Sequence, residues 1–133
     1  MHLIVCIDER NGLSFCGRRL SRDGILNQHM SELTSGHKLW MNGYSAKMFL
    51  GDTVCTDEDF LAKALPGDFC FLENAPLPQT NEALESVILY HWNRAYPSNV
   101  RFPRALLDGM HLVKTEEFPG RSHEKITMEW YTR

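Results

Sequence analysis

The chain has 133 residues, which suits one modest hydrophobic core, so we expect residues 1–133 to fold as a single domain. Its formal net charge of −3 does not favour nucleic acid as a partner. No apolar run approaches a membrane span of about 18 residues, and the N-terminus lacks a signal-peptide core, so we expect neither a membrane nor secretion. The four cysteines form no CxxC pair and mostly lie in strand-like runs, which favours the reducing cytoplasm.

The first half of the chain predicts strands that alternate with short helices. Residues 2–7, HLIVCI, form a continuous apolar run, which is typical of a strand buried on both faces. Residues 20–36 place apolar side chains at helical spacing, with Ser21 or Asp23 as the N-cap and Gly36 as the stop. The pattern then predicts strands over 37–41 and 53–55, and short helices over 45–51 and 56–65.

The second half predicts one more buried strand, an irregular stretch and a closing hairpin. Residues 68–74 form a short apolar run, and residues 81–94 read as a half-turn of helix that leads into a strand. Two alternating runs, 110–118 and 123–133, flank a Pro-Gly turn, which is typical of an antiparallel hairpin. The order of elements therefore predicts an α/β fold with a mixed central sheet, flanking short helices and a C-terminal antiparallel hairpin.

Four stretches of this sequence resemble the dihydrofolate reductase family. Residues 87–103 run without a gap against that family's pattern, with His91, Phe102 and Pro103 on matching positions. Three further stretches match more loosely, namely 3–17, 40–45 and 112–133. The resemblance implies a dihydrofolate reductase-like fold in a truncated, diverged and, we expect, bacterial member.

The residues on the family's proton-transfer positions differ in chemistry. An alignment without gaps puts Leu26 on the position of the acid that helps to protonate the pterin, and Tyr90 on the position of that acid's partner threonine. Asp23 lies one turn earlier, where residues three apart share a helix face, so it can replace the acid or simply cap the helix. Asp23 and Tyr90 are therefore the candidate catalytic residues.

The nucleotide-binding positions also depart from the family. The resemblance implies NADPH as cofactor, but Gly43 stands where the family has an arginine that grips a phosphate, and Ser45 keeps only a hydroxyl. Glu73 and Asn74 replace a Gly-Gly pair that lies beside the pyrophosphate, and a carboxylate repels phosphate. Residues 49–55 are shorter than the matching part of the family, which removes a binding wall.

The sequence predicts a remnant ligand cleft between the 18–22 loop, the helix that starts near Asp23, and Tyr90. Three arginines in that loop could receive a carboxylate or a phosphate, or could merely keep a loop soluble. His91 could carry a proton or could be satisfied by backbone groups. No histidine spacing predicts a metal site. The candidate ligand-binding residues are Cys6, Arg18, Arg19, Arg22, Leu26, Met30, Asn42, Gly43, Ser45 and His91.

Three functional hypotheses follow from these observations. The first is a diverged protein without reductase activity that binds a small anionic or heteroaromatic ligand in the remnant cleft. The second is an NADPH-dependent reductase of a pterin or pyrimidine-like substrate, with Asp23 or a water supplying the proton. The third is a protein-interaction or assembly module, in which an exposed apolar sheet edge pairs with a second copy to form a homodimer.

Overall fold

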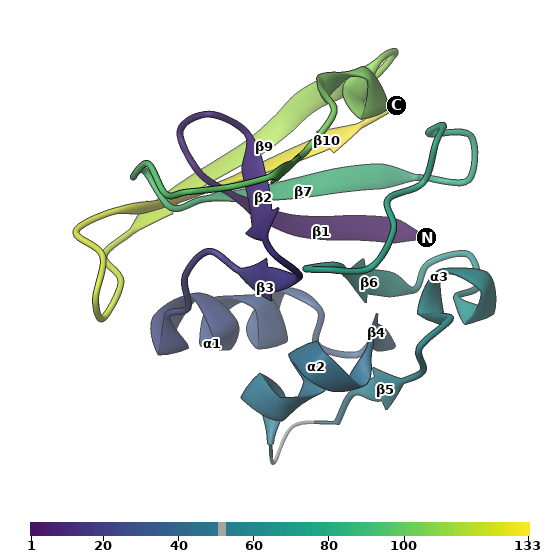
Figure 1. Ribbon diagram of the computed structural model, residues 1–133. Helices are drawn as coiled ribbons and strands as arrows, with labels where there is room; N and C mark the ends of the chain where they lie inside the picture. Colours follow the sequence, from purple (N-terminus) through teal and green to yellow (C-terminus); the bar gives the residue numbers. More distant parts are fainter. Residues whose placement is uncertain (51–52) are drawn as a thin grey trace.

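A seven-stranded mixed sheet forms the centre of the computed structural model, which describes residues 1–50 and 53–133 (Figure 1). The central strand is β1, and β9 forms one edge of the sheet as described. From one edge to the other, the strands are β5 (Cys55–Thr56), β4 (Leu39–Met41), β6 (Phe69–Phe71), β1 (His2–Ile7), β7 (Ser86–His91), β10 (Ile126–Thr132) and β9 (His111–Phe118).

The pairing of the strands confirms the predicted mixed sheet. β1 runs parallel to both β6 and β7, and β4 runs parallel to β5 and β6. β10 is antiparallel to β7 and to β9, so the last two strands form the predicted terminal hairpin. Alternate residues of β1 point to opposite faces, with Ile4 packing into one core and Leu3 into the other, as expected of a strand buried on both sides.

Short helices cover both faces of the sheet. On one face, α1 (Gly24–Leu33) contributes Leu26 and Met30, and the 3₁₀ turn η1 (Lys47–Phe49), which follows α2 (Gly43–Ala46), contributes Phe49. On the other face, α3 (Phe60–Lys63) and the 3₁₀ turn η2 (Arg104–Leu107) pack through the side chains of Phe60 and Leu106. None of the helices within the described ranges is long and apolar enough to cross a membrane.

A second, three-stranded sheet was not predicted. β2 (Gly12–Phe15) pairs with β3 (Arg18–Arg19) in a tight hairpin, and also with β8 (Val100–Arg101). The hairpin turn uses Cys16 and Gly17, both at positive φ. Strands of two to four residues leave too short a pattern to recognise, and β8 pairs across more than 80 residues of chain, so the sequence indicated only a loop and an irregular stretch.

The boundaries of several predicted elements were wrong. α1 begins at Gly24 rather than near residue 20, and Asp23, not Ser21, is the N-cap, because its side chain accepts from the backbone N–H of Ile25. The helix predicted over 56–65 is formed only as the four-residue α3, and residues 81–85 form turns instead of a half-turn of helix. Residues 51 and 52, which belong to the predicted 45–51 helix and to the shortened 49–55 stretch, lie outside the described residues.

Candidate ligand site

Polar side chains gather at the carboxyl ends of the neighbouring parallel strands β4, β6 and β1. Asn42 follows β4 directly, Glu73 comes two residues after the end of β6, and Cys6 is the next-to-last residue of β1. The carboxyl ends of parallel strands lie at the same edge of a sheet, which is where open α/β sheets bind ligands. This edge is therefore the first candidate for a ligand site.

A nearly buried ion pair occupies this edge. The guanidinium of Arg19 donates to both carboxylate oxygens of Glu73, from Nε at 2.9 Å and from Nη2 at 3.0 Å. The Ser45 hydroxyl donates to Glu73 Oε1 at 2.7 Å. Burial disfavours the charge on Arg19, but the hydrogen bond and the charge of Glu73 outweigh it and raise the pKa of Arg19. The pair is a bidentate fork, the geometry in which arginine holds carboxylates most strongly.

The β2–β3 hairpin is fastened over this ion pair. The side chain of Tyr44 lies beneath Arg19, whose guanidinium carbon is 4.2 Å from the ring centroid, and its hydroxyl accepts from the Arg19 backbone N–H at 3.0 Å. Asn42 Nδ2 donates to Asn74 Oδ1, and Asn74 Nδ2 donates to the carbonyl of Gly17, each at 2.9 Å. The hairpin is thus joined both to the start of α2 and to the end of β6.

Little space remains beneath the hairpin. The cavity there measures about 10 Å³, room for the centre of roughly one water molecule. It is lined by Cys6, Leu13, Arg19, Leu20, Ser21, Leu72, Glu73 and Trp92. Burial, with a further contribution from Glu73, raises the pKa of the Cys6 thiol well above its ordinary value. The space beneath the hairpin is therefore small, and Arg19 forms part of its wall.

The junction between β4 and α2 forms a capped turn. Asn42 is the N-cap of α2, and its Oδ1 accepts from the Ser45 backbone N–H at 3.1 Å. The Gly43 backbone N–H donates to the carboxylate of Glu58 at 2.8 Å, so an acid of this chain already takes the place that an anion would need. α2 is also only four residues long.

Tyr90 lies in a hydrogen-bonded chain that leads to the surface. Its side chain is fully buried beside Leu26 and Met30 in the core, and its hydroxyl lies 2.8 Å from Nδ1 of His29. His29 Nε2 lies 2.8 Å from a carboxylate oxygen of Glu116 on β9. Burial raises the pKa of Tyr90 far above its ordinary value. The phenol does not line the cavity beneath the hairpin.

Asp23 lies in a separate polar cluster at the start of α1. Its carboxylate caps the helix and also accepts from the backbone N–H groups of Arg121 at 3.0 Å and Ser122 at 2.9 Å. His123 Nδ1 lies 2.9 Å from Asp23 Oδ2, and both side chains are almost fully buried. Burial works to raise the pKa of Asp23, but these donors outweigh it and hold the pKa well below its usual range.

Several residues predicted for the cleft lie apart from it. Arg18 and Arg22 are exposed to solvent. His91 is on the sheet face opposite Tyr90, because adjacent residues of a strand alternate, and its Nε2 lies 2.5 Å from Glu129 Oε1. Leu26 and Met30 are closely packed core residues. The structure brings together only Cys6, Arg19, Asn42 and Ser45, around Glu73 and Asn74.

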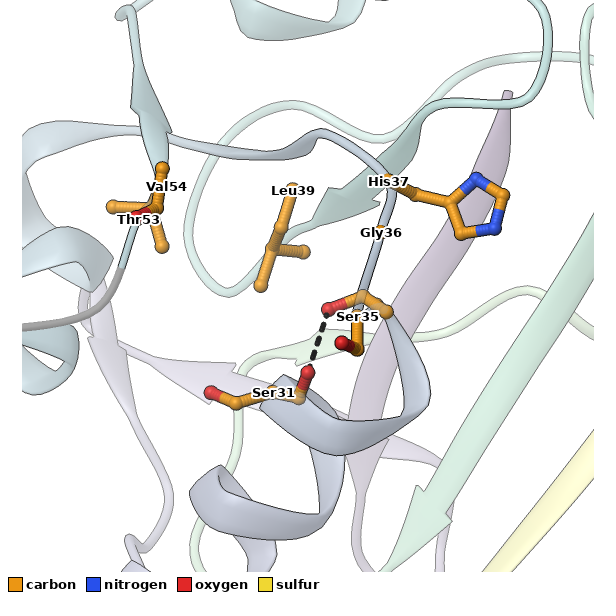
Figure 2. A pocket seen from close by; sticks show the side chains of 8 residues that line it. Ser31, Ser35, Gly36, His37, Leu39, Thr53 and Val54 are labelled. Carbon is orange, nitrogen blue, oxygen red and sulfur yellow. Dashed lines mark hydrogen bonds between the residues drawn. The ribbon is translucent and has the colours of Figure 1, made fainter.

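A further pocket, away from this edge of the sheet, is lined largely by hydroxyl-bearing side chains. A shallow pocket of about 370 Å³ lies between the end of α1 and the start of β4, and Figure 2 shows Ser31, Ser35, His37 and Thr53 around it, with Leu39 and Val54. Among the residues that the structure describes, its lining supplies hydroxyl groups and an imidazole but no Lys, Arg, Asp or Glu side chain. Within residues 1–50 and 53–133, no group of three or more His, Cys, Asp or Glu side chains could hold a metal ion.

Comparisons with known proteins identify the fold. No protein-family model matches this chain, and no curated protein matches it. Chains of solved structures do match, 227 in all. One is the dihydrofolate reductase from Enterococcus faecalis complexed with NADP(H) and RAB-propyl, which has a TM-score of 0.68 over 99% of this chain and 95% of its own, at 13% sequence identity. The chain therefore has a dihydrofolate reductase-like α/β fold.

Sequence reasoning missed the residues that organise these clusters. In the sequence, Glu73 was notable only because a carboxylate repels phosphate, and its partner Arg19 is 54 positions away. His29 and His123 appeared only as two of six histidines with no metal spacing. One available signal was the position of Glu73, because a charged residue directly after a buried apolar strand must find a partner when it is buried.

Proposed function

We propose that this protein has lost pterin reductase activity and binds a small anionic or heteroaromatic ligand at the carboxyl ends of β4, β6 and β1. The observation that carries the proposal is the bidentate pair of Arg19 and Glu73, which occupies the edge of the sheet where this class of fold binds ligands. We also propose a cytoplasmic location, which the four unpaired cysteines support.

The first support is the space available. A cavity of about 10 Å³ is far below the roughly 300 Å³ or more of pockets that hold drug-sized molecules. A pterin together with a nicotinamide ring would require the β2–β3 hairpin to move and Arg19 to leave Glu73.

The second support is the loss of a proton donor. Leu26, on the position of the family's acid, is 1% exposed and has no group that can transfer a proton. The carboxylate of Asp23 faces the 120–123 turn, and its lowered pKa keeps it ionised near neutral pH. Tyr90 is held by His29, and burial raises its pKa. Neither candidate catalytic residue therefore offers a proton to the cavity beneath the hairpin.

The ion pair itself defines two classes of ligand. An anion would compete with Glu73 for the guanidinium of Arg19, because guanidinium groups bind carboxylates and phosphates in the same forked geometry. A heteroaromatic ring with an amino-amidine edge would compete with Arg19 for Glu73, because that edge presents two parallel N–H donors. Tyr44 already supplies an aromatic face against the planar group that occupies the fork.

A thermal-shift titration tests this function. Wild-type protein is titrated with citrate as the anionic probe, pterin as the heteroaromatic probe, NADPH, and dihydrofolate. The same probes are applied to Arg19→Ala and to the matched control Arg18→Ala, which removes the exposed neighbour on β3. A ligand at 100 times its Kd stabilises the native state by about 2.7 kcal/mol, enough to raise Tm by several degrees.

We expect citrate to raise Tm in the wild type and in Arg18→Ala but not in Arg19→Ala. Pterin should raise Tm most in Arg19→Ala, where Glu73 has lost its internal partner. If Arg19→Ala does not fold, the double variant Arg19→Ala with Glu73→Gln removes the unpaired charge and tests the citrate arm alone. A saturable NADPH shift, with NADPH oxidation on adding dihydrofolate, would instead support the reductase hypothesis. No shift with citrate or pterin in any variant would refute ligand binding at this edge.

A further inference from the structure

We propose that Ser21, His123 and Asp23 form a nucleophilic hydrolytic site that acts on small carboxylic esters, with Ser21 as the nucleophile and His123 as its base. The proposal does not require a ligand to bind at Arg19 and Glu73, although Arg19 lines the same cavity. The inference rests on the geometry of the three side chains, which the chain brings together from positions 100 residues apart.

The distances match a nucleophile–base–carboxylate arrangement. The hydroxyl oxygen of Ser21 lies 3.0 Å from His123 Nε2, and His123 Nδ1 lies 2.9 Å from Asp23 Oδ2. Both contacts fall in the range of about 2.6–3.2 Å expected between a nucleophile, its base and the group that orients the base. Such constellations recur on unrelated folds in different chain orders, so they are identified by geometry rather than by sequence.

The surroundings of Asp23 fix the tautomer of His123. The carboxylate also accepts from the backbone N–H groups of Ile25, Arg121 and Ser122, so it is held as an anion. An ionised carboxylate only accepts hydrogen bonds, and the facing Nδ1 must therefore carry the hydrogen. In the neutral imidazole, Nε2 then carries the lone pair and lies 3.0 Å from the Ser21 hydroxyl, which is the arrangement required of a general base.

The base is shielded from water. The side chains of His123 and Asp23 are 2% and 0% exposed, and the ring of Trp92 stacks on the imidazole with 4.7 Å between centroids. The Tyr96 hydroxyl lies 3.1 Å from Nε2, so it shares the same lone pair with Ser21 and helps to hold the ring. Asp23 is a positioning residue in this arrangement, because it acts on the substrate only through His123.

Ser21 links the buried pair of His123 and Asp23 to the cavity beneath the hairpin. Unlike its two partners, Ser21 is only half-buried, and it lines the cavity of about 10 Å³ together with Arg19 and Cys6. Because that space has room for only about one water molecule, we choose the smallest common acyl group, acetyl, with the alcohol portion outside. Within the described residues, Nη1 of Arg19 makes no hydrogen bond, and Arg19 lines the same cavity, so we assign this nitrogen to the carbonyl oxygen that gains negative charge.

The proposed reaction proceeds in two balanced steps. The Ser21 oxygen attacks the ester carbonyl while its proton passes to His123 Nε2; the bond to the alcohol oxygen then breaks, and the alcohol leaves with that proton. The product is an acyl ester on Ser21. Water then attacks this ester, again giving its proton to Nε2, and the Ser21 oxygen leaves with the proton, which releases the carboxylic acid and restores the starting state.

The test uses p-nitrophenyl acetate with the wild-type protein, Ser21→Ala and Ser35→Ala. Ser35 is a matched control, because it is a serine in a different pocket whose lining includes neither His123 nor Asp23. We expect wild type and Ser35→Ala to release p-nitrophenol and to carry one acetyl group on Ser21 by peptide mass spectrometry. Ser21→Ala should lose about 100-fold or more of the rate.

A fluorophosphonate probe provides a second reading that does not depend on turnover. It should label Ser21 in native protein and fail to label urea-unfolded protein, because the activated hydroxyl exists only when His123 is in place. Circular dichroism confirms that Ser21→Ala is folded. Hydrolysis by Ser21→Ala at the wild-type rate, acetyl groups only on lysines, or no labelling of native protein would each refute the proposal.

Discussion

Replacing Asp23 with asparagine separates its shape from its charge. The two oxygens of Asp23 have different partners: Oδ1 accepts from Ile25 and Arg121, whereas Oδ2 accepts from Ser122 and His123. The asparagine side chain can keep its carbonyl oxygen on the Oδ1 side and so preserve the helix cap. Its NH₂ group then faces the Ser122 backbone N–H, which it cannot satisfy, and Nδ1 of His123, which it can satisfy only if the imidazole changes tautomer.

The expected cost of Asp23→Asn is about 3 kcal/mol of unfolding free energy. A hydrogen bond to a charged group contributes roughly 1.5–3 kcal/mol, and a buried donor left without a partner costs about 1–3 kcal/mol. The Ser122 hydroxyl can rotate to accept from the new NH₂, and His123 can move its proton to Nε2. We therefore count chiefly the Ser122 backbone N–H left without an acceptor and the lost hydrogen bond between His123 and a charged carboxylate. Urea unfolding followed by tryptophan fluorescence measures the difference.

The pH dependence provides a second readout with a definite sign. Because the pKa of Asp23 is lower in the folded protein than in the unfolded chain, the unfolded chain binds the extra proton first, and wild-type stability falls as pH drops below about 4. This single group adds a slope of up to about 1.4 kcal/mol per pH unit. Asp23→Asn should lack that contribution. A loss of under about 1 kcal/mol at pH 7, or the same acid slope in both proteins, would refute the reasoning.

Two further predictions concern packing and thiol reactivity. Gly120→Ala should lower the unfolding free energy by about 1–3 kcal/mol in the same urea assay, because a Cβ there would lie 2.6 Å from Asp23 Oδ2; an unchanged midpoint would contradict this crowding. A thiol reagent such as DTNB should label the exposed Cys16 quickly, but Cys6 and Cys70 only on unfolding, since burial raises the pKa of Cys70 to about 12 and that of Cys6 as well. Rapid labelling of either buried thiol in native protein would contradict this expectation.

The sequence by itself determined the elements whose burial follows a regular period. The continuous apolar run of β1, the helical spacing of Leu26 and Met30, and the terminal hairpin are all local signals, and the structure confirms each of them. The hairpin connection is longer than the predicted Pro-Gly turn, because residues 119–125 separate β9 from β10. These signals can be read from sequence because a strand or helix shows its buried faces within a few neighbouring residues.

The alternation of side chains along a strand could have excluded one pair of residues from the predicted cleft. Tyr90 and His91 are adjacent in a strand, so their side chains must leave opposite faces of the sheet. A cleft that includes Tyr90 therefore could not also include His91 without a bulge between them, and the register with β1 has none.

Only the tertiary structure decided how the polar residues are partnered. Arg19 meets Glu73 because a tight turn at Cys16 and Gly17 folds β3 back over the end of β6, and His123 meets Asp23 because the turn after β9 reaches the start of α1. The residues of these two pairs are 54 and 100 positions apart in the chain, and no periodic pattern in the sequence indicates which segments become neighbours. The same fact explains why the cavity at this edge is small: Arg19 in its wall comes from a hairpin whose position depends on non-local strand pairing.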